Sequence, residues 1–348
     1  MNSAMKPEHA WYGPQMAERV DEWTHHFSST ELAELEDASE QLVVQGRDIL
    51  SIDKAAFSLG ECASTLARVR RDLLEGRGFC LFRGLPVGRW GRLKSAICFW
   101  GIGAHLGVAV SQNGKGHVLG HVKNLGLDYS LPATRGYQTS ERLPFHTDYA
   151  DLVGLMCLRP AKRGGQSALV SSRTVYEEMR KQRPDLVDVL RQPLYRTRWG
   201  EVGSDRPPWV EVPAFNVHSE GVMTTYVRSA VRKAQLMEEV PRLTDAQVEA
   251  MDYFDALAED DRLHFTMDFA PGDVQFVNNH WLLHSRTGYD DADDPTERRH
   301  LLRLWLACVD GPPFPLAATE SFQGLTANGR PNGIHVPGVP FCAPLDAE

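Results

Sequence analysis

The sequence predicts a mainly β fold with flanking helices, in which a barrel or jelly roll is joined to a helical N-terminal layer. Two observations predict it. From about residue 107 onward, short apolar runs of strand length alternate with turns rich in Gly, Pro and Asp. Before that point, long stretches carry helix caps and a helical spacing of apolar residues. No internal repeat, low-complexity tract or Ser/Gly-rich linker divides the chain, so we expect one domain.

The first third of the chain is expected to be helical around one buried strand. Ser29 and Thr30 are candidate N-caps of a first helix, and Gly76 can end a second one. An apolar run bracketed by Gly and Pro follows and is typical of a buried strand. The expected elements are helices within residues 29–75, the second of them over 59–74, a strand over 78–86 and a helix over 90–105.

The rest of the chain is expected to be mostly β. Several runs have strand length and turn residues on both sides; they are Val118–Val122, Leu152–Leu158, Ser167–Val170 and Leu301–Leu306. One helix, over 245–260 with Thr244 as its N-cap, interrupts this series. The turn Pro271-Gly272-Asp273 comes next and leads into a β-branched run.

Composition limits the classes of function. The chain has 348 residues with 42% hydrophobic content, enough for a large core. A net charge of -9 without a Lys/Arg-rich block argues against a nucleic-acid partner. No apolar run is long enough for a signal peptide or a membrane span, so we expect a cytoplasmic protein that acts on a small molecule. Self-association stays open. The six cysteines form no CxxC pair and are expected to be buried thiols.

The tetrapeptide Phe145-His146-Thr147-Asp148 is the most informative feature of the chain. On a strand, His146 and Asp148 would project in the same direction. Two histidines and one carboxylate can cap one face of Fe(II) and leave three coordination sites free. The third ligand must come from elsewhere, and both His280 and His284 are candidates.

The segment that leads to these two histidines is β-branched, so a helical pair of ligands at i and i+4 is disfavoured there. The same objection applies to His117 and His121, which we expect to lie at the surface or beside a site.

Arg299 and Arg303 lie in an apolar stretch that is predicted to be a strand, on one face of it. A buried guanidinium needs an anionic partner. A dicarboxylate such as 2-oxoglutarate would fit, because its 2-oxo acid end can chelate iron while its far carboxylate binds an arginine. An internal pair between arginine and Asp or Glu is the alternative.

Several short motifs occur in a characteristic order; they are Phe145–Asp148, Gly164–Ser167, Met223–Val227, Pro271–Asp273, Asn279 with Leu283-His284, and Arg298-Arg299 with Arg303. In these motifs the chain resembles the taurine dioxygenase-like (TauD/TfdA) family of 2-oxoglutarate oxygenases over about residues 76–315. The resemblance implies a double-stranded β-helix, a form of jelly roll. We therefore expect a helical layer at 1–75 within the same domain, an oxygenase core at 76–315 and a C-terminal tail at 316–348.

The resemblance also implies roles for single residues. It assigns His146, Asp148 and His284 as the Fe(II) ligands and thus favours His284 over His280. Arg299 would hold the distal carboxylate of 2-oxoglutarate, assisted by the hydroxyl of Ser167, where the family usually has threonine. Arg303 would bind either the keto-acid end of this cosubstrate or an anionic group of the substrate.

The function implied is that of a dioxygenase that uses Fe(II), 2-oxoglutarate and O2 and releases succinate and CO2. We expect it to hydroxylate an unactivated carbon of a small, anionic or amino-acid-like metabolite. Desaturation or cyclisation at the same iron site, and a non-catalytic jelly-roll sensor of metal or small acids, are the alternatives. Halogenation is disfavoured because Asp148 keeps the carboxylate that halogenating relatives replace with a small residue.

The substrate is expected to bind near the metal. Candidates for the mouth of its cavity are Gln138, Thr139, Arg142 and the segment 198–228. Trp199, Trp209 and Phe215 would form either an apolar lid or part of the core.

Overall fold

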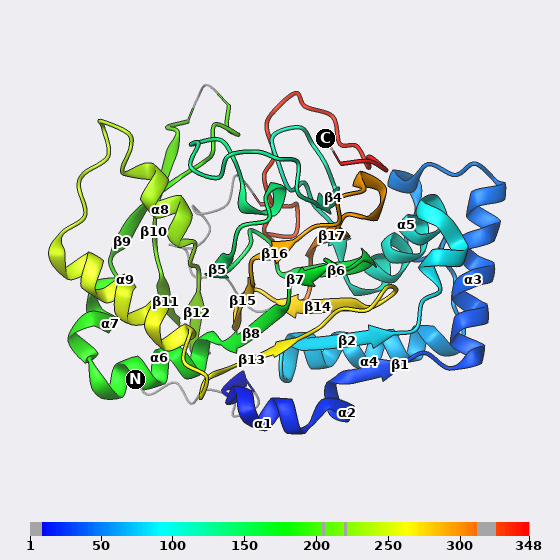
Figure 1. The fold of residues 1–348 in the computed structure, drawn as a ribbon, viewed down its shortest axis with the longest axis horizontal. Coiled ribbons are helices and arrows are strands. Elements are labelled where there is room, and N and C mark those ends of the chain that lie inside the picture. Colours follow the sequence, from blue (N-terminus) through cyan, green and yellow to red (C-terminus); the bar gives the residue numbers. More distant parts are fainter. Residues whose placement is uncertain (1–8, 204–205, 219–220, 312–324, 348) are drawn as a thin grey trace.

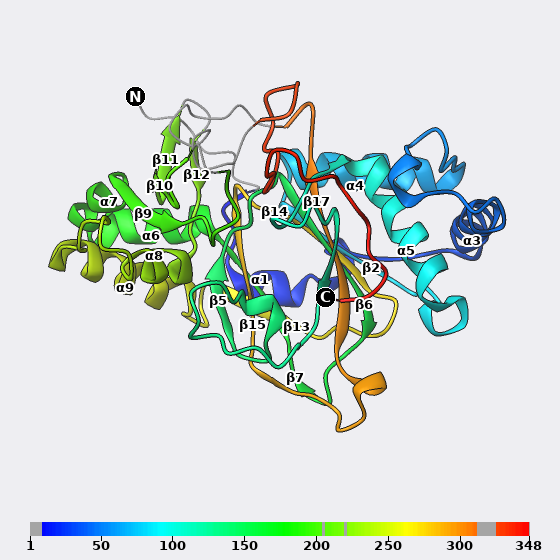
Figure 2. The same ribbon diagram turned by 90° about the horizontal axis from the view of Figure 1, so that it is seen from above.

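The computed structural model describes residues 9–203, 206–218, 221–311 and 325–347. Two β-sheets form the centre of the molecule, and helices cover it on both sides (Figures 1 and 2). The predicted jelly roll with flanking helices is confirmed. Parts of the expected core and tail, residues 312–324 and 348, lie outside the described residues, and the division of the chain at 75 and 315 stays a prediction.

The larger sheet has seven strands in the order β1-β2-β14-β6-β17-β3, with β4 also paired to β17. Its members are β1 (Thr24–His26), β2 (Phe79–Arg83), β3 (Val108–Ala109), β4 (Leu119–Val122), β6 (Leu152–Arg159), β14 (Val274–Asn278) and β17 (His300–Ala307). Strands β6, β14 and β17 lie at its centre and pair antiparallel. Every residue of β17 is buried, so the arginine within it must face the interior.

The smaller sheet has the order β13-β8-β15-β5 and is antiparallel throughout. Its members are β5 (Leu143–His146), β8 (Ser167–Ser171), β13 (His264–Met267) and β15 (Leu282–Arg286). Three short antiparallel pairs complete the described strands; they are β7 (Arg163–Gly164) with β16 (Tyr289–Asp290), β9 (Pro193–Thr197) with β10 (Trp209–Pro213), and β11 (Phe215–His218) with β12 (Gly221–Thr224).

Two groups of helices flank the sheets (Figure 2). The N-terminal group comprises α1 (Gly13–Glu18), α2 (Val20–Trp23), α3 (Ser29–Val44), α4 (Glu61–Glu75) and α5 (Val87–Leu106). The second group comprises α6 (Ser172–Gln182), α7 (Pro184–Leu190), α8 (Arg228–Ala234) and α9 (Asp245–Ala258). Single 3-10 turns occur at Ile49–Ser51, Gly136–Gln138 and Pro295–Glu297.

Hydrophobic packing ties each helical group to a sheet. Leu35 of α3 and Phe99 of α5 share one buried cluster with Phe276 of β14. Phe254 of α9 shares another with Phe145 and Leu283 of the smaller sheet. Because side chains alternate along a strand, the residues next to Phe145 and Leu283 face the opposite way, into the space between the sheets.

The first long helix differs from expectation at its start. Its N-cap is Ser28, so the assignment of Ser29 or Thr30 was wrong. Ser28 has an extended backbone, its Oγ accepts from the Glu31 N–H at 3.1 Å, and the Glu31 carboxylate accepts from the Ser28 N–H at 2.8 Å. This capping box fixes the boundary one residue earlier.

The other expected elements agree with the structure within a few residues. Gly76 follows α4 directly, and Thr244 caps α9. Helix α5 begins at Val87 and contains a break at Gly91, whose φ of 72° suits glycine. Five cysteines are buried as free thiols and Cys342 is partly exposed.

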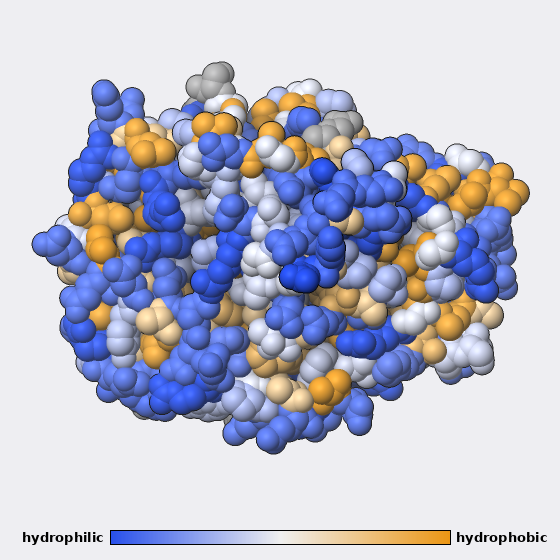
Figure 3. Space-filling view, in the orientation of Figure 1, coloured by the Kyte–Doolittle hydropathy of each residue, from blue (hydrophilic) through white to orange (hydrophobic). Residues whose placement is uncertain are grey.

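On the face seen in Figure 3, hydrophilic residues predominate and apolar ones gather in small groups, most clearly over the N-terminal helices at the right. Within the described part of the chain, no helix combines the length and apolarity needed to cross a membrane. The cytoplasmic location, the absence of a nucleic-acid partner and any self-association stay predictions.

Candidate active site

His146, Asp148 and His284, here called the triad, lie together between the sheets. Their ligand atoms are all within 4.8 Å of one another. His146 is the last residue of β5, and His284 on the antiparallel neighbour β15 is its direct cross-strand partner. His284 Nε2 lies 3.7 Å from Asp148 Oδ2. The two strands therefore place both imidazoles side by side.

Asp148 reaches the triad by a different route from the one expected. It lies beyond the end of β5 rather than on a strand beside His146. The chain turns after Thr147, whose N–H donates to Tyr226 O at 2.8 Å. The side chain of Asn279 then accepts from the Asp148 N–H at 3.1 Å and donates to Ala150 O at 3.1 Å. Asn279 thus fixes the loop that carries the carboxylate.

The triad has the protonation states that a divalent metal needs. The Nδ1–H of His146 donates to Pro144 O at 2.8 Å, which leaves its Nε2 lone pair free. Burial lowers the pKa of His146, and burial together with the charge of His146 lowers the pKa of His284 to about 3. Burial alone would raise the pKa of Asp148, but the charge of Arg303, with the neighbouring imidazoles and the Trp305 hydrogen bond, outweighs it and lowers that pKa. Two neutral imidazoles and one carboxylate suit Fe(II).

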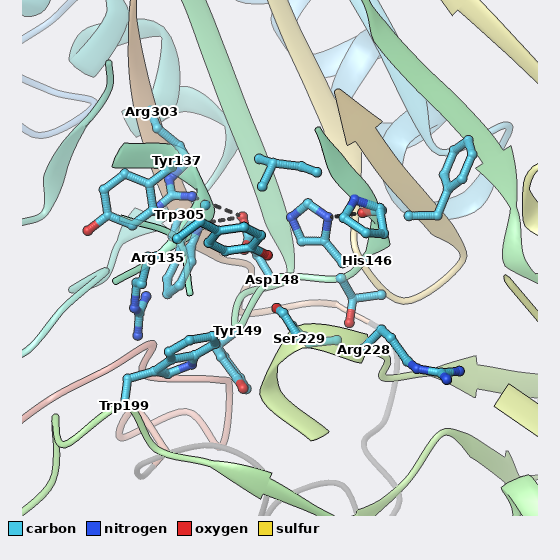
Figure 4. A pocket seen from close by; sticks show the side chains of 17 residues that line it. Arg135, Tyr137, His146, Asp148, Tyr149, Trp199, Arg228, Ser229, Arg303 and Trp305 are labelled. Carbon is cyan, nitrogen blue, oxygen red and sulfur yellow. Dashed lines mark hydrogen bonds and ion pairs between the residues drawn. The ribbon is translucent and has the colours of Figure 1, made fainter. Parts of the chain in front are cut away.

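Two residues of β17 hold the carboxylate of Asp148 in place (Figure 4). The indole N–H of Trp305 donates to Asp148 Oδ2 at 2.8 Å, and Arg303 Nη1 lies 3.6 Å from the same oxygen. The guanidinium of Arg303 lies over the rings of Tyr137 and Trp305, and its Nε–H donates to Gln112 Oε1 at 2.7 Å. Arg303 is therefore fixed beside the triad.

A first cavity, here called the arginine cavity, holds about 490 Å³ of space, part of it open to solvent. The polar side chains that line it are His146, His284, Ser167, Ser285, Tyr137, Arg286, Arg299 and Arg303. Arg299 is 4% exposed, and burial lowers its pKa. Among the described residues its Nη1 has no hydrogen-bond partner, and no carboxylate lies within ion-pair distance of its guanidinium. The internal ion pair considered for Arg299 is therefore not found there.

Ser167 lines the same cavity, and its Oγ donates to Gln275 Oε1 at 3.2 Å. For Arg303, by contrast, the contact with Asp148 partly agrees with the alternative of an internal ion pair between arginine and a carboxylate. An unpaired buried guanidinium and a hydroxyl beside a metal-type triad are what a chelating dicarboxylate requires. The residues present thus fit both groups that the sequence implies.

The other histidines that the sequence offered lie apart from the triad. His280 is 2% exposed and its Nε2 lies 2.7 Å from Asp151 Oδ1, in a separate buried network. His117 and His121 are each 8% exposed, so a surface position was wrong. His121 Nδ1 lies 2.7 Å from His300 Nε2, which makes it part of a buried histidine pair.

A second cavity, here called the aromatic cavity, also borders the triad and holds about 630 Å³, part of it open to solvent. Its aromatic and charged lining residues are Tyr129, Tyr137, Phe145, Tyr149, Trp199, Trp305, Arg135, Arg228, Arg303, His146 and Asp148 (Figure 4). From the segment 198–228, Trp199, Val227 and Arg228 line it. Trp199 has a positive φ of 59°, uncommon outside glycine.

Other residues expected at its mouth lie elsewhere. The side chain of Arg142 is 54% exposed and pairs with Glu259, so it is drawn away from the cavity. Gln138, Thr139 and Trp209 do not line it. Phe215 is 1% exposed in the core beside α9.

The lining residues that sequence reasoning missed include Arg135, Tyr137, Arg286 and Trp305. For two of them a signal was present. Arg286 follows His284 by two positions, and Trp305 follows Arg303 by two, so each shares a strand face with an assigned site residue. Burial, with the charge of Arg299, lowers the pKa of Arg286 to about 10.

Comparison with known proteins gives a match that includes these site residues. Residues 45–305 match the model of the "Taurine catabolism dioxygenase TauD, TfdA family". The chain belongs to this family. Among TauD/TfdA relatives, the FR-33289 synthase of Streptomyces rubellomurinus is 30% identical over 327 residues, which cover 92% of this chain and 95% of the relative. The taurine hydroxylase-like protein SAT17 of Stachybotrys chartarum is 28% identical over 317 residues, covering 86% and 79%.

Solved structures share the fold. An asparagine oxygenase in complex with Fe(II), a hydroxyasparagine and succinate aligns with a TM-score of 0.63 at 17% identity, over 88% of this chain and 98% of that one. The non-haem iron oxygenase OrfP aligns with a TM-score of 0.64 at 15% identity, over 89% and 99%. The TauD/TfdA assignment confirms the predicted enzyme class, a non-haem Fe(II)- and 2-oxoglutarate-dependent dioxygenase. The sensor alternative is thereby disfavoured.

Proposed function

We propose that His146, Asp148 and His284 bind Fe(II), and that the arginine cavity binds 2-oxoglutarate. One observation carries the proposal: His146 and His284 of the triad line the same cavity as Arg299, whose buried Nη1 lacks a partner among the described residues. A dicarboxylate in this cavity would pair with that guanidinium and present its other end to the metal. Ser167 would add a hydroxyl to the arginine-bound end.

When bound, Fe(II), 2-oxoglutarate and O2 supply the oxidant for a C–H bond, with release of succinate and CO2. The chain supplies position and exclusion of water. Asn279 and Trp305 keep Asp148 turned toward the two imidazoles. Arg303 lines both cavities and lies beside Asp148, so we assign it to the carboxylate at the keto-acid end of the cosubstrate.

The substrate is proposed to be a small, anionic or amino-acid-like metabolite that the enzyme hydroxylates. The aromatic cavity borders His146 and Asp148 of the triad, where a substrate must lie to be oxidised. Its charged lining residues other than the triad are three arginines, Arg135, Arg228 and Arg303. Arg135 pairs with Glu201, and Arg228 pairs with Asp252 and Asp255. Arg303, whose contact with Asp148 is longer at 3.6 Å, is therefore the arginine best placed to meet an anionic group of the substrate. Asp148 lies with the two histidines and occupies the place that a halide would need, so hydroxylation is favoured over halogenation.

Two measurements test the proposal. Anaerobic addition of 2-oxoglutarate to the Fe(II)-loaded protein should give a weak visible charge-transfer band, and absence of the band would refute the chelate. Succinate release should then be screened over small carboxylates, sulfonates, phosphate esters and amino acids. A hit among anionic compounds supports the substrate class, whereas hits confined to amines or neutral compounds would contradict it. His284→Ala is the inactive control.

A further inference from the structure

We propose that Arg286 is a second binding residue for the distal carboxylate of the cosubstrate. Arg286 and Arg299 would bind this carboxylate together. The inference rests on the proposed function of the arginine cavity. It adds a residue that none of the sequence motifs singled out, and it makes the distal end of this cavity a site with two guanidinium groups.

The position of Arg286 supports this role. It follows His284 by two residues on β15, so both side chains lie on the same face of the strand. A strand rises about 3.3 Å per residue, which places the two Cα atoms roughly 7 Å apart. That separation is of the order of the carbon chain between the keto group and the far carboxylate of 2-oxoglutarate. Ser167, assigned to the same carboxylate, is the direct cross-strand partner of Arg286.

The environment of Arg286 leaves its charge without a counterion. The residue is 5% exposed. Its Nη2 donates to the backbone oxygens of Thr139 and Glu141, while its Nε and Nη1 are buried and have no hydrogen-bond partner among the described residues. Within the described ranges, no carboxylate lies at ion-pair distance from it. Buried N–H groups without hydrogen-bond partners favour the binding of an anion that can accept hydrogen bonds from them.

Arg286 and Arg299 both line the arginine cavity, and both lie against the ring of Tyr289. The guanidinium carbon of Arg286 lies 4.7 Å from the ring centre of Tyr289, and that of Arg299 lies 5.0 Å from the same centre. The ring offers each cation a weak attraction but carries no neutralising charge. A carboxylate has two oxygens and about four acceptor positions, so one such group can satisfy both guanidinium groups at once.

The competing role for Arg286 is purely structural, because its Nη2 also anchors the backbone at 139–141. The two roles differ in how they depend on the ligand. A structural anchor would affect every 2-oxo acid that chelates the metal. A carboxylate-binding residue would affect only those that carry a distal carboxylate.

The test is an anaerobic titration of the Fe(II)-loaded protein, followed by the visible band. Two ligands are compared: 2-oxoglutarate, and 2-oxopentanoate, which has the same carbon chain without the distal carboxylate. For Arg286→Met we expect the Kd of 2-oxoglutarate to rise at least tenfold and the Kd of 2-oxopentanoate to stay within about twofold of wild type. Arg286→Lys, which restores a charge, should recover part of the loss.

The control is Arg142→Met, since Arg142 is exposed and pairs with Glu259 outside the cavity. It should bind both ligands as the wild type does. Equal weakening of both ligands in Arg286→Met, or no change in either, would overturn the inference. A wild-type protein that binds neither ligand would instead refute the proposed function of the cavity.

Discussion

Trp305 donates its indole N–H to Oδ2 of Asp148 over 2.8 Å. Asp148 belongs to the triad and Trp305 lies beside it, yet the two residues are 157 positions apart in the chain. The hydrogen bond occupies one lone pair of the carboxylate and fixes its rotation, so that the remaining acceptor positions can face the metal. Partners of this kind tune metal affinity as much as the ligands do.

Removing this hydrogen bond should weaken metal binding. Trp305→Phe keeps the ring but loses the donor, and we expect the Kd of Fe(II) to rise about 10- to 100-fold. Anaerobic metal titration measures it. Trp100→Phe is the matched control, because the Trp100 indole donates to Ile52 O, also at 2.8 Å, away from both cavities. Equal effects in the two variants would contradict the role of Trp305.

Substitutions of His280, which lies between β14 and β15, and of His284, which lies on β15, should have different effects. His284→Ala should abolish stoichiometric iron binding, because it removes one imidazole of the triad. His280→Ala should retain iron and lose stability, since it strips a partner from the buried Asp151. Metal content after gel filtration and urea unfolding distinguish the outcomes. The opposite pattern would make His280 the ligand.

Arg299 should control the affinity for the cosubstrate. Arg299→Gln removes a buried charge from its proposed anionic partner, a loss of roughly 2–5 kcal/mol. We expect the 2-oxoglutarate concentration for half-maximal succinate release to rise at least tenfold. Arg298→Gln is the control, since its neighbour Arg298 does not line the arginine cavity. An unchanged requirement in Arg299→Gln would remove this residue from the site.

The C-terminal segment should stabilise the fold through one buried ion pair. Arg330 Nε donates to Asp151 Oδ2 at 2.9 Å, and its Nη2 contacts Oδ1 of the same fully buried carboxylate. Arg330→Met leaves Asp151 with fewer partners and should cost about 3–5 kcal/mol of unfolding free energy. Urea denaturation measures the loss. Arg330→Lys, which keeps the charge, should lose less; equal stability of wild type and Arg330→Met would show that the pair contributes nothing.

The buried histidine pair should make stability fall in acid. Burial, followed by the charge of His121, lowers the pKa of His300 to about 3, and burial also lowers the pKa of His121. Below the ordinary pKa of about 6.5 the unfolded chain binds protons that the folded chain does not. Unfolding free energy present at pH 7 is therefore lost as the pH falls through 6 and 5, by up to about 1.4 kcal/mol per unit for each histidine. His300→Gln should flatten this dependence, and an unchanged slope would count against the pair.

The sequence predicted the pairing of His146 with Asp148 because the two residues are close neighbours in the chain, whereas His284 was preferred to His280 only through the family resemblance. His146 and His284 each lie on a short strand whose sequence is largely apolar, and such a strand turns one of its faces toward the interior. Arg299 could be foreseen as a charge beside an apolar run, but it does not share a strand with Arg303 as expected, because β17 begins one residue later, at His300. The register between β5 and β15 could not be read from either strand alone.

Other features depend on contacts that no local pattern reveals. Asp148 leaves the strand because Asn279, far along the chain, holds its loop. Arg142 turns outward because Glu259 of the loop after α9 pairs with it. The N-cap at Ser28 was misplaced by one residue because three neighbouring hydroxyls, at 28, 29 and 30, offer the same chemistry, and only the reach of Glu31 distinguishes them.

The cross-strand pairing of His284 with His146 has a practical consequence for handling the protein. A slip of β15 by one residue would turn His284 toward the hydrophobic cluster and replace it with Leu283 or Ser285, while a similar number of backbone hydrogen bonds could form. Such molecules would look native by circular dichroism and size. Iron content per chain is therefore the quality measure that distinguishes a competent preparation from a well-folded but inert one.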